Sequence, residues 1–81
     1  ADKYTAVITK DGEALIRLSV KELADQLDPQ YFWQIHRGTI VNAQHIAATS
    51  RDEAGHVLVK IKSHTQILQV SRAYAHLFRQ M

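Results

Sequence analysis

The chain contains no cysteine, which excludes a disulfide scaffold and cysteine–zinc sites and fits a cytoplasmic location. It has one proline and three glycines in 81 residues, and no linker or low-complexity segment divides it. No apolar run approaches the ~20 residues that a membrane span needs, and the N-terminus lacks the basic and apolar regions of a signal peptide. These absences predict one small domain over residues 1–81, without membrane contact.

Carboxylates are scarce in the second part of the chain. Residues 29–81 carry only Asp52 and Glu53, against six lysines and arginines and all five histidines. Residues 1–28 carry six carboxylates against four basic side chains. Such asymmetry is expected where one face meets an anionic partner. A solvated surface with clustered charges is the alternative, and charge alone does not choose between the two.

The sequence shows no constellation typical of catalysis or metal binding. The glycines form no phosphate-cradling loop, and the histidines lack paired spacings such as HExxH. Asp52-Glu53 beside Gly55 is typical of a solvated turn. Ser71 is better explained as a helix cap than as the nucleophile of a catalytic triad. We therefore expect a protein that is not an enzyme, with no cofactor and no metal.

Hydrophobic periodicity predicts a mainly β chain with two short helices. Strands are expected at residues 4–9, 14–18, 31–36, 46–50, 57–62 and 65–70, and Ile40-Val41 is a further apolar pair. Residues 10–13 and 63–64 are expected to form tight turns, with Gly12 supplying the positive φ that the first turn needs.

Serines predict the start of both helices. Residues 19–22 match a capping box, so a helix should run from Ser19 to about Leu27 and end before Pro29. Ser71 should cap a terminal helix. That helix would place its apolar residues on one face: Tyr74, Leu77 and Phe78.

Residues 31–42, YFWQIHRGTIVN, are the most informative stretch. They resemble the signature of LytTR DNA-binding domains, in which an aromatic pair precedes an Ile-His-Arg-Ser-like turn and a Val-Asn step. Ile46 fills the place of the isoleucine that follows. The capping-box helix before this stretch, the hairpin after it and Val70-Ser71-Arg72 agree in order and spacing, so the resemblance covers essentially the whole chain. Gly38 and Ala73 depart from the more usual serine and second basic residue.

The resemblance implies a fold of small antiparallel β-sheets and hairpins in an elongated stack. It implies sequence-specific binding of double-stranded DNA by the output domain of a bacterial transcriptional regulator. An upstream receiver or sensor domain, paired direct-repeat targets and a homodimer on DNA are further implications. The strands that usually begin the family fold are missing, so we expect an N-terminally truncated domain with an exposed sheet edge.

The resemblance also implies that loops, rather than a recognition helix, contact the bases in the major groove. The residues that correspond to the family's contacts are Lys3, Tyr4, His36, Arg37, Gly38, Thr39, Ser71 and Arg72. Arginine can bond guanine O6 and N7 in bidentate fashion, and the helix start at Ser71 would offer N–H groups to a phosphate. Lys62, with Lys60 and His64, is expected either to flank the DNA backbone or to lie on a solvated hairpin.

Several of these residues have structural alternatives. His36 contacts phosphate or braces its turn, and bracing is slightly favoured. Asn42 is expected to hold the following turn, and Trp33 to pack rather than stack on bases. For the whole domain, the alternative is a protein-interaction or sensory β module without DNA binding. A single-stranded nucleic-acid binder ranks lower, because six aromatic residues leave few for stacking.

Overall fold

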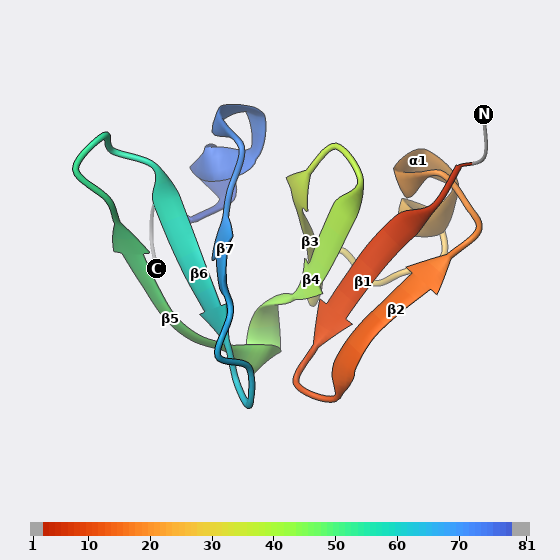
Figure 1. Cartoon of the computed structure of the whole chain (residues 1–81). Coiled ribbons are helices and arrows are strands. Elements are labelled where there is room, and N and C mark those ends of the chain that lie inside the picture. Colours follow the sequence, from red (N-terminus) through yellow and green to blue (C-terminus); the bar gives the residue numbers. More distant parts are fainter. Residues whose placement is uncertain (1–2, 79–81) are drawn as a thin grey trace.

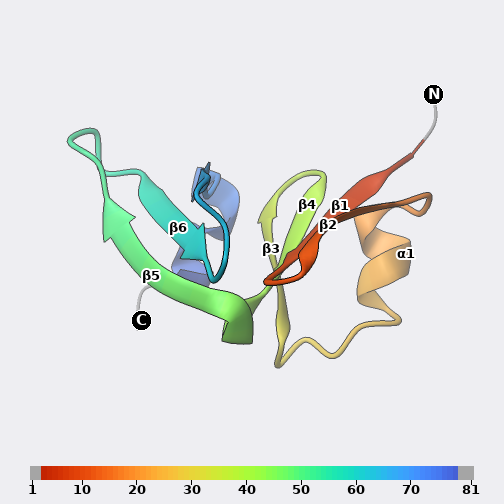
Figure 2. The ribbon, with the colours of Figure 1, turned by 60° about the horizontal axis from the view of Figure 1, so that its bottom comes forward.

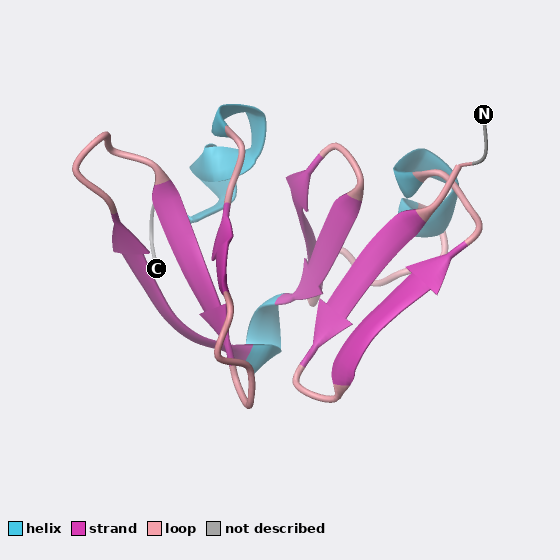
Figure 3. Cartoon of the chain, in the orientation of Figure 1, coloured by secondary structure: helices cyan, strands magenta, loops and turns pink. Residues whose placement is uncertain are grey.

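The computed structural model describes residues 3–78, which form two small sheets (Figure 1). The elements are β1 (Thr5–Thr9), β2 (Gly12–Ile16), α1 (Val20–Ala24), β3 (Phe32–His36), β4 (Thr39–Asn42), η1 (Ala43–His45), β5 (Ile46–Arg51), β6 (Val57–Ile61), β7 (Ile67–Gln69) and η2 (Arg72–Phe78). Strands dominate and the helices are short (Figure 3), which confirms the mainly β prediction.

The first sheet has the strand order β2-β1-β4-β3. Two of its pairs are antiparallel, but β1 and β4 run parallel, with Ala6 opposite Thr39. This pair is parallel because β2, α1 and β3 form a crossover that brings β4 back beside β1, so the first sheet is mixed while every other strand pair is antiparallel as expected. Ile40 and Val41 are buried because β4 lies inside the sheet. Two apolar residues were too short a pattern to predict that strand.

The second sheet, β5-β6-β7, is antiparallel throughout. The short helix η1 connects it to β4, and the two sheets lie side by side with η1 at one end between them (Figure 2). Asn42 opens η1, where its Oδ1 accepts a hydrogen bond from the Gln44 N–H over 2.9 Å. The structural role expected for Asn42 is thereby confirmed.

One apolar cluster holds both sheets and η2 together. Its buried members are Ile8, Ile35, Val41, Val57, Val59, Ile61, Val70 and Phe78. Trp33 of β3 meets Phe78 of η2 edge to face, with ring centroids 5.2 Å apart and an interplanar angle of 76°. Trp33 therefore packs, as predicted, and this contact seats η2 on the first sheet.

The two helices that the sequence predicted differ in part from the prediction. The capping box at Ser19 is present, but α1 ends at Ala24 because Gln26 N bonds the Leu23 carbonyl three residues back. The terminal helix is 3-10 rather than α. With three residues per turn, Ala75 and Phe78 share the packed face, and Leu77 stays 36% exposed instead of joining them.

Candidate nucleic-acid interface

The segments expected to contact DNA gather at one end of the molecule. The turn between β3 and β4, the start of β1 and the start of η2 all lie along the upper side of Figure 1. We call this the arginine end, comprising residues 3–4, 36–39 and 71–72. These segments are up to 69 positions apart in sequence (72 − 3), so only the fold brings them together.

Hydrogen bonds join the first two segments. The Ala6 N–H donates to the Gly38 carbonyl over 2.8 Å, which fixes the start of β1 beside the β3–β4 turn. Buried Thr5 anchors the same stretch, because its Oγ1 donates to the Leu18 carbonyl over 2.8 Å. Lys3 and Arg37 consequently line one open cleft, whose other lining residues are Tyr4, Thr5, Ser19, Val20 and Gly38.

A β-bulge joins the turn to η2. The β3–β4 register shifts between Gln34 and His36, so buried Ile35 is an extra residue in β3. The Ile35 carbonyl accepts a hydrogen bond from Ser71 N–H over 2.8 Å. The next carbonyl, that of His36, accepts one from Gln34 Nε2 over 3.0 Å. The bulge thus ties the turn that carries Arg37 to the residue before Arg72.

The two arginines of this end are available to a partner. Arg37 and Arg72 are exposed, and within residues 3–78 neither takes part in an ion pair. His36 is also exposed, and no hydrogen bond between residues 3 and 78 uses its imidazole. The expected bracing by His36 is therefore not seen, and the Gln34 side chain braces this turn instead.

Two further residues of the arginine end are Gly38, where the space for a side chain matters, and Ser71, where the hydrogen bonds matter. A Cβ at residue 38 would have the Tyr4 carbonyl oxygen 4.0 Å away, so this position has room for the serine usual in the family. Ser71 caps η2 as predicted, with its Oγ accepting from Ala73 N–H and its carbonyl from Tyr74 N–H. Those N–H groups are already used, which removes them from the set expected to bind a phosphate.

A carboxylate stands beside the cleft. Hydrogen bonds from the Ser19 side chain and backbone, with help from the charge of Lys3, lower the pKa of Glu22 below its ordinary value of 4.5. Glu22 therefore stays ionised at neutral pH. Because it repels phosphate, the α1 side of the cleft is unfavourable for a DNA backbone.

Lys62 lies away from this surface. Its turn, between β6 and β7, falls on the lower side of Figure 1 beside the β1–β2 turn and η1. We call this the histidine end, comprising residues 9–12, 43–45 and 62–66. His45 Nδ1 accepts from Lys10 N–H over 3.0 Å, and His64 Nε2 lies 2.8 Å from the Thr9 carbonyl. The fold does not bring Lys62 to the arginine end, and His64 connects the two sheets.

The β5–β6 turn forms a separate polar unit. The Asp52 carboxylate accepts from the N–H groups of Ala54 and His56 and lies 2.9 Å from His56 Nδ1. These contacts with His56, its backbone N–H first, lower the pKa of Asp52. A solvated turn is what the sequence predicted for this segment.

Within the described part of the chain no group of three potential ligands could hold a metal, and no helix is long and apolar enough to cross a membrane.

This fold and site define a mainly β module that presents exposed arginines from loops. The model of the family described as LytTr DNA-binding domain matches residues 1–81. The chain therefore belongs to the LytTR DNA-binding domains.

Two relatives accord with that membership. The chain is 45% identical over 82 residues to an uncharacterised response regulatory protein of Vibrio cholerae, covering 96% of this chain and 31% of that protein. It is 33% identical over 70 residues to the CO-responsive transcriptional regulator RcoM of Rhodospirillum rubrum, covering 86% of this chain and 30% of that protein. The chain thus spans about a third of the length of these relatives. No solved structure matches it.

Proposed function

We propose that this domain recognises specific sequences in double-stranded DNA by placing the loops of its arginine end in the major groove. Family membership supports DNA binding and a place in transcription regulation. The observation that carries the finer proposal is that the segments bearing Arg37 and Arg72 lie along the same side of the molecule, with both side chains exposed and free of ion pairs within residues 3–78. Each can present its guanidinium fork to guanine O6 and N7.

The remaining residues of this end have supporting parts in the proposal. Lys3 and His36, both exposed, face the phosphates on either side of the groove, as a point charge and a hydrogen-bond donor respectively. Backbone and short side chains at Tyr4, Gly38, Thr39 and Ser71 complete the surface that the duplex touches. Lys62 is left outside this surface, because its turn lies at the histidine end.

The whole protein, in this proposal, couples a sensor to this output domain. The relatives are about three times as long as the matched region, and their names describe a response regulatory protein and a CO-responsive regulator. We propose an upstream receiver or sensor domain, a cytoplasmic location, and two copies acting as a homodimer on paired direct repeats. Sedimentation of the domain on duplexes carrying one or two copies of its selected site tests the last point.

A second candidate, a protein-interaction module, is favoured by apolar side chains on the sheet edges. Leu15 on β2 is 67% exposed and Ile67 on β7 is 51% exposed, and both strands end their sheets. Unpaired edges of this kind can accept a strand from another chain. Strand pairing with another chain could accompany DNA binding, or it could be the function of the domain in place of DNA binding.

Selection from a random duplex pool, followed by a salt titration of the selected site, separates the two candidates. If ~4–6 phosphates are neutralised, the slope of log affinity against log salt should be on the order of −4 to −5. Enrichment of a shared sequence with that slope supports the proposal. A flat salt response, or no duplex binding at low salt, would contradict it and favour the protein-interaction module.

A further inference from the structure

We propose that Gln34 and Tyr74 are positioning residues for DNA reading, and that their side-chain hydrogen bond sets the placement of Arg37 relative to Arg72. This inference rests on the proposed function. Neither residue belongs to the arginine end, the surface expected to touch DNA. They lie 40 residues apart in sequence, and the fold joins them directly.

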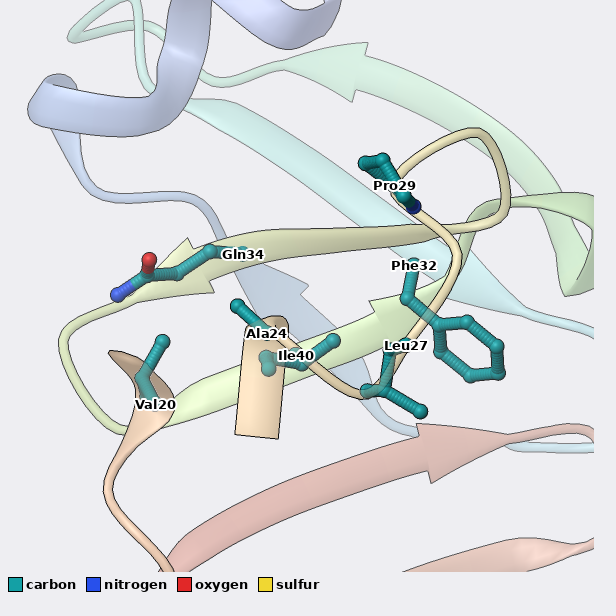
Figure 4. A pocket seen from close by; sticks show the side chains of 7 residues that line it. All are labelled: Val20, Ala24, Leu27, Pro29, Phe32, Gln34 and Ile40. Carbon is teal, nitrogen blue, oxygen red and sulfur yellow. The ribbon is translucent and has the colours of Figure 1, made fainter. Parts of the chain in front are cut away.

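The side-chain amide of Gln34 uses both of its N–H hydrogens in hydrogen bonds. Nε2 donates to Tyr74 Oη over 2.9 Å and to the His36 carbonyl over 3.0 Å. Gln34 also borders an apolar pocket between α1 and the first sheet, and its amide points away from the apolar side chains there (Figure 4). One side chain therefore bridges the turn that precedes Arg37 and the helix that starts at Arg72.

The hydrogen bond between Gln34 and Tyr74 is one of three contacts that attach η2 and the residue before it to β3. At the far end of η2, Phe78 packs edge to face on Trp33 of β3. At the near end, the Ser71 N–H holds the bulge at Ile35. The Gln34–Tyr74 bond supplies a third point of attachment, two residues from Arg72, and three points define an orientation.

Orientation matters to this kind of recognition more than to general electrostatic attraction. A bidentate arginine–guanine pair needs its donors placed to within about 0.5 Å, whereas phosphate attraction tolerates larger displacements. Loss of the bridge should therefore weaken the specific site selectively. The net charge is unchanged by replacing tyrosine with phenylalanine, so non-specific binding should stay the same.

The test compares Tyr74→Phe with Tyr31→Phe as a matched control. Tyr31 is half-buried, and within residues 3–78 its hydroxyl has no hydrogen-bond partner, so the control removes the same atom without breaking a bridge. Affinities are measured for the selected site and for a scrambled duplex, in the wild type and in Arg72→Ala. Melting temperatures establish that each variant is folded.

We expect Tyr74→Phe to weaken the selected site about two- to tenfold, the range of one net hydrogen bond, and to leave the scrambled duplex unaffected. In the Arg72→Ala background the same change should have no further effect, because the arginine it positions is gone. Tyr31→Phe should bind as the wild type does.

Wild-type affinity in Tyr74→Phe would overturn the inference while leaving the proposed function intact. An equal loss on both duplexes, or the same loss in Arg72→Ala, would overturn it too, because a merely structural role predicts that pattern. Failure of the wild type to bind any duplex would overturn the proposed function, and this inference with it.

Discussion

The two ends of this domain use their polar groups in opposite ways. At the histidine end, His45 and His64 are occupied by the backbone of the β1–β2 turn, and the Lys62 N–H donates to the His45 carbonyl over 2.7 Å. At the arginine end, Arg37 and Arg72 have no ion pair with any residue from 3 to 78. One end joins the sheets and the other remains available to a ligand.

This difference refines what the charge asymmetry of the sequence means. All five histidines lie in residues 29–81 and suggested a surface for an anion. In the fold, His45 and His64 connect the sheets and His56 pairs with Asp52. The basic groups left for an anionic partner at the arginine end are fewer than composition suggests, so specificity there depends on the placement of two arginines more than on total charge.

The largest expected effect is the loss of either arginine. Arg37→Ala and Arg72→Ala should each cost about 1–3 kcal/mol in binding the selected site and relax the preference at one base position. Folding should be nearly unchanged, because both side chains are exposed. A panel of single-base variants of the site measures both effects.

Arg51→Ala serves as the arginine control, because Arg51 Nη1 already donates to the Gly55 carbonyl in the β5–β6 turn. If Arg37→Ala and Arg72→Ala weakened selected and scrambled duplexes equally, both arginines would be phosphate contacts. The arginine end would then bind DNA without reading it.

Next in size is the loss of the His45 acceptor at the histidine end. His45→Ala should lower the free energy of unfolding by about 0.5–1.5 kcal/mol, because Lys10 N–H loses its partner. The folded fraction should bind the selected site as before. Urea unfolding and affinity are measured side by side, with His76→Ala, at an exposed position in η2, as the control. A change in site preference with His45→Ala would show that the two ends are coupled.

The β5–β6 turn provides a smaller effect that tests neither end. The pKa of Asp52 is lowered below its ordinary value of 3.8, so its contribution to stability is complete above that pH and disappears as the pH falls through the lower folded value. Asp52→Ala should lower the melting temperature at pH 7, and the difference from wild type should vanish in strong acid. Glu53→Ala, beside it in the same turn, is the control. A difference that persisted unchanged in acid would assign the effect to something other than the carboxylate charge.

The smallest expected effect is that of Lys62→Ala. Because Lys62 lies at the histidine end, the salt slope and the affinity should remain those of the wild type. A backbone contact would instead weaken all sequences alike and reduce the slope by about one unit. That outcome would mean that the duplex runs along the molecule from one end to the other.

Local interactions in this protein could be predicted from the sequence. The capping box joins Ser19 to Glu22, three positions away, and the first hairpin turns at Lys10 and Asp11, between Thr9 and Gly12. The aromatic and apolar pattern around Ile35 located the strand and its His-Arg turn. In each case the residues that interact are close in the chain, so their spacing carries the geometry.

Long-range pairings could not be predicted in the same way. The parallel β1–β4 pair depends on how the crossover through α1 closes, and the extra residue Ile35 depends on register with β4. The Gln34–Tyr74 bond spans 40 residues, and the His64–Thr9 contact spans 55. Many partners of suitable chemistry lie at such separations, and no periodicity selects among them.

The sequence by itself determined the mainly β class, the family resemblance and the two arginines that we propose as base readers. Tertiary structure alone decided that these arginines share one end, that Lys62 lies at the other, and that Gln34 fixes the turn to the last helix. The physical reason is that periodicity and capping act over a few residues. The relative placement of loops follows instead from how strands pair and from how one buried cluster closes around them.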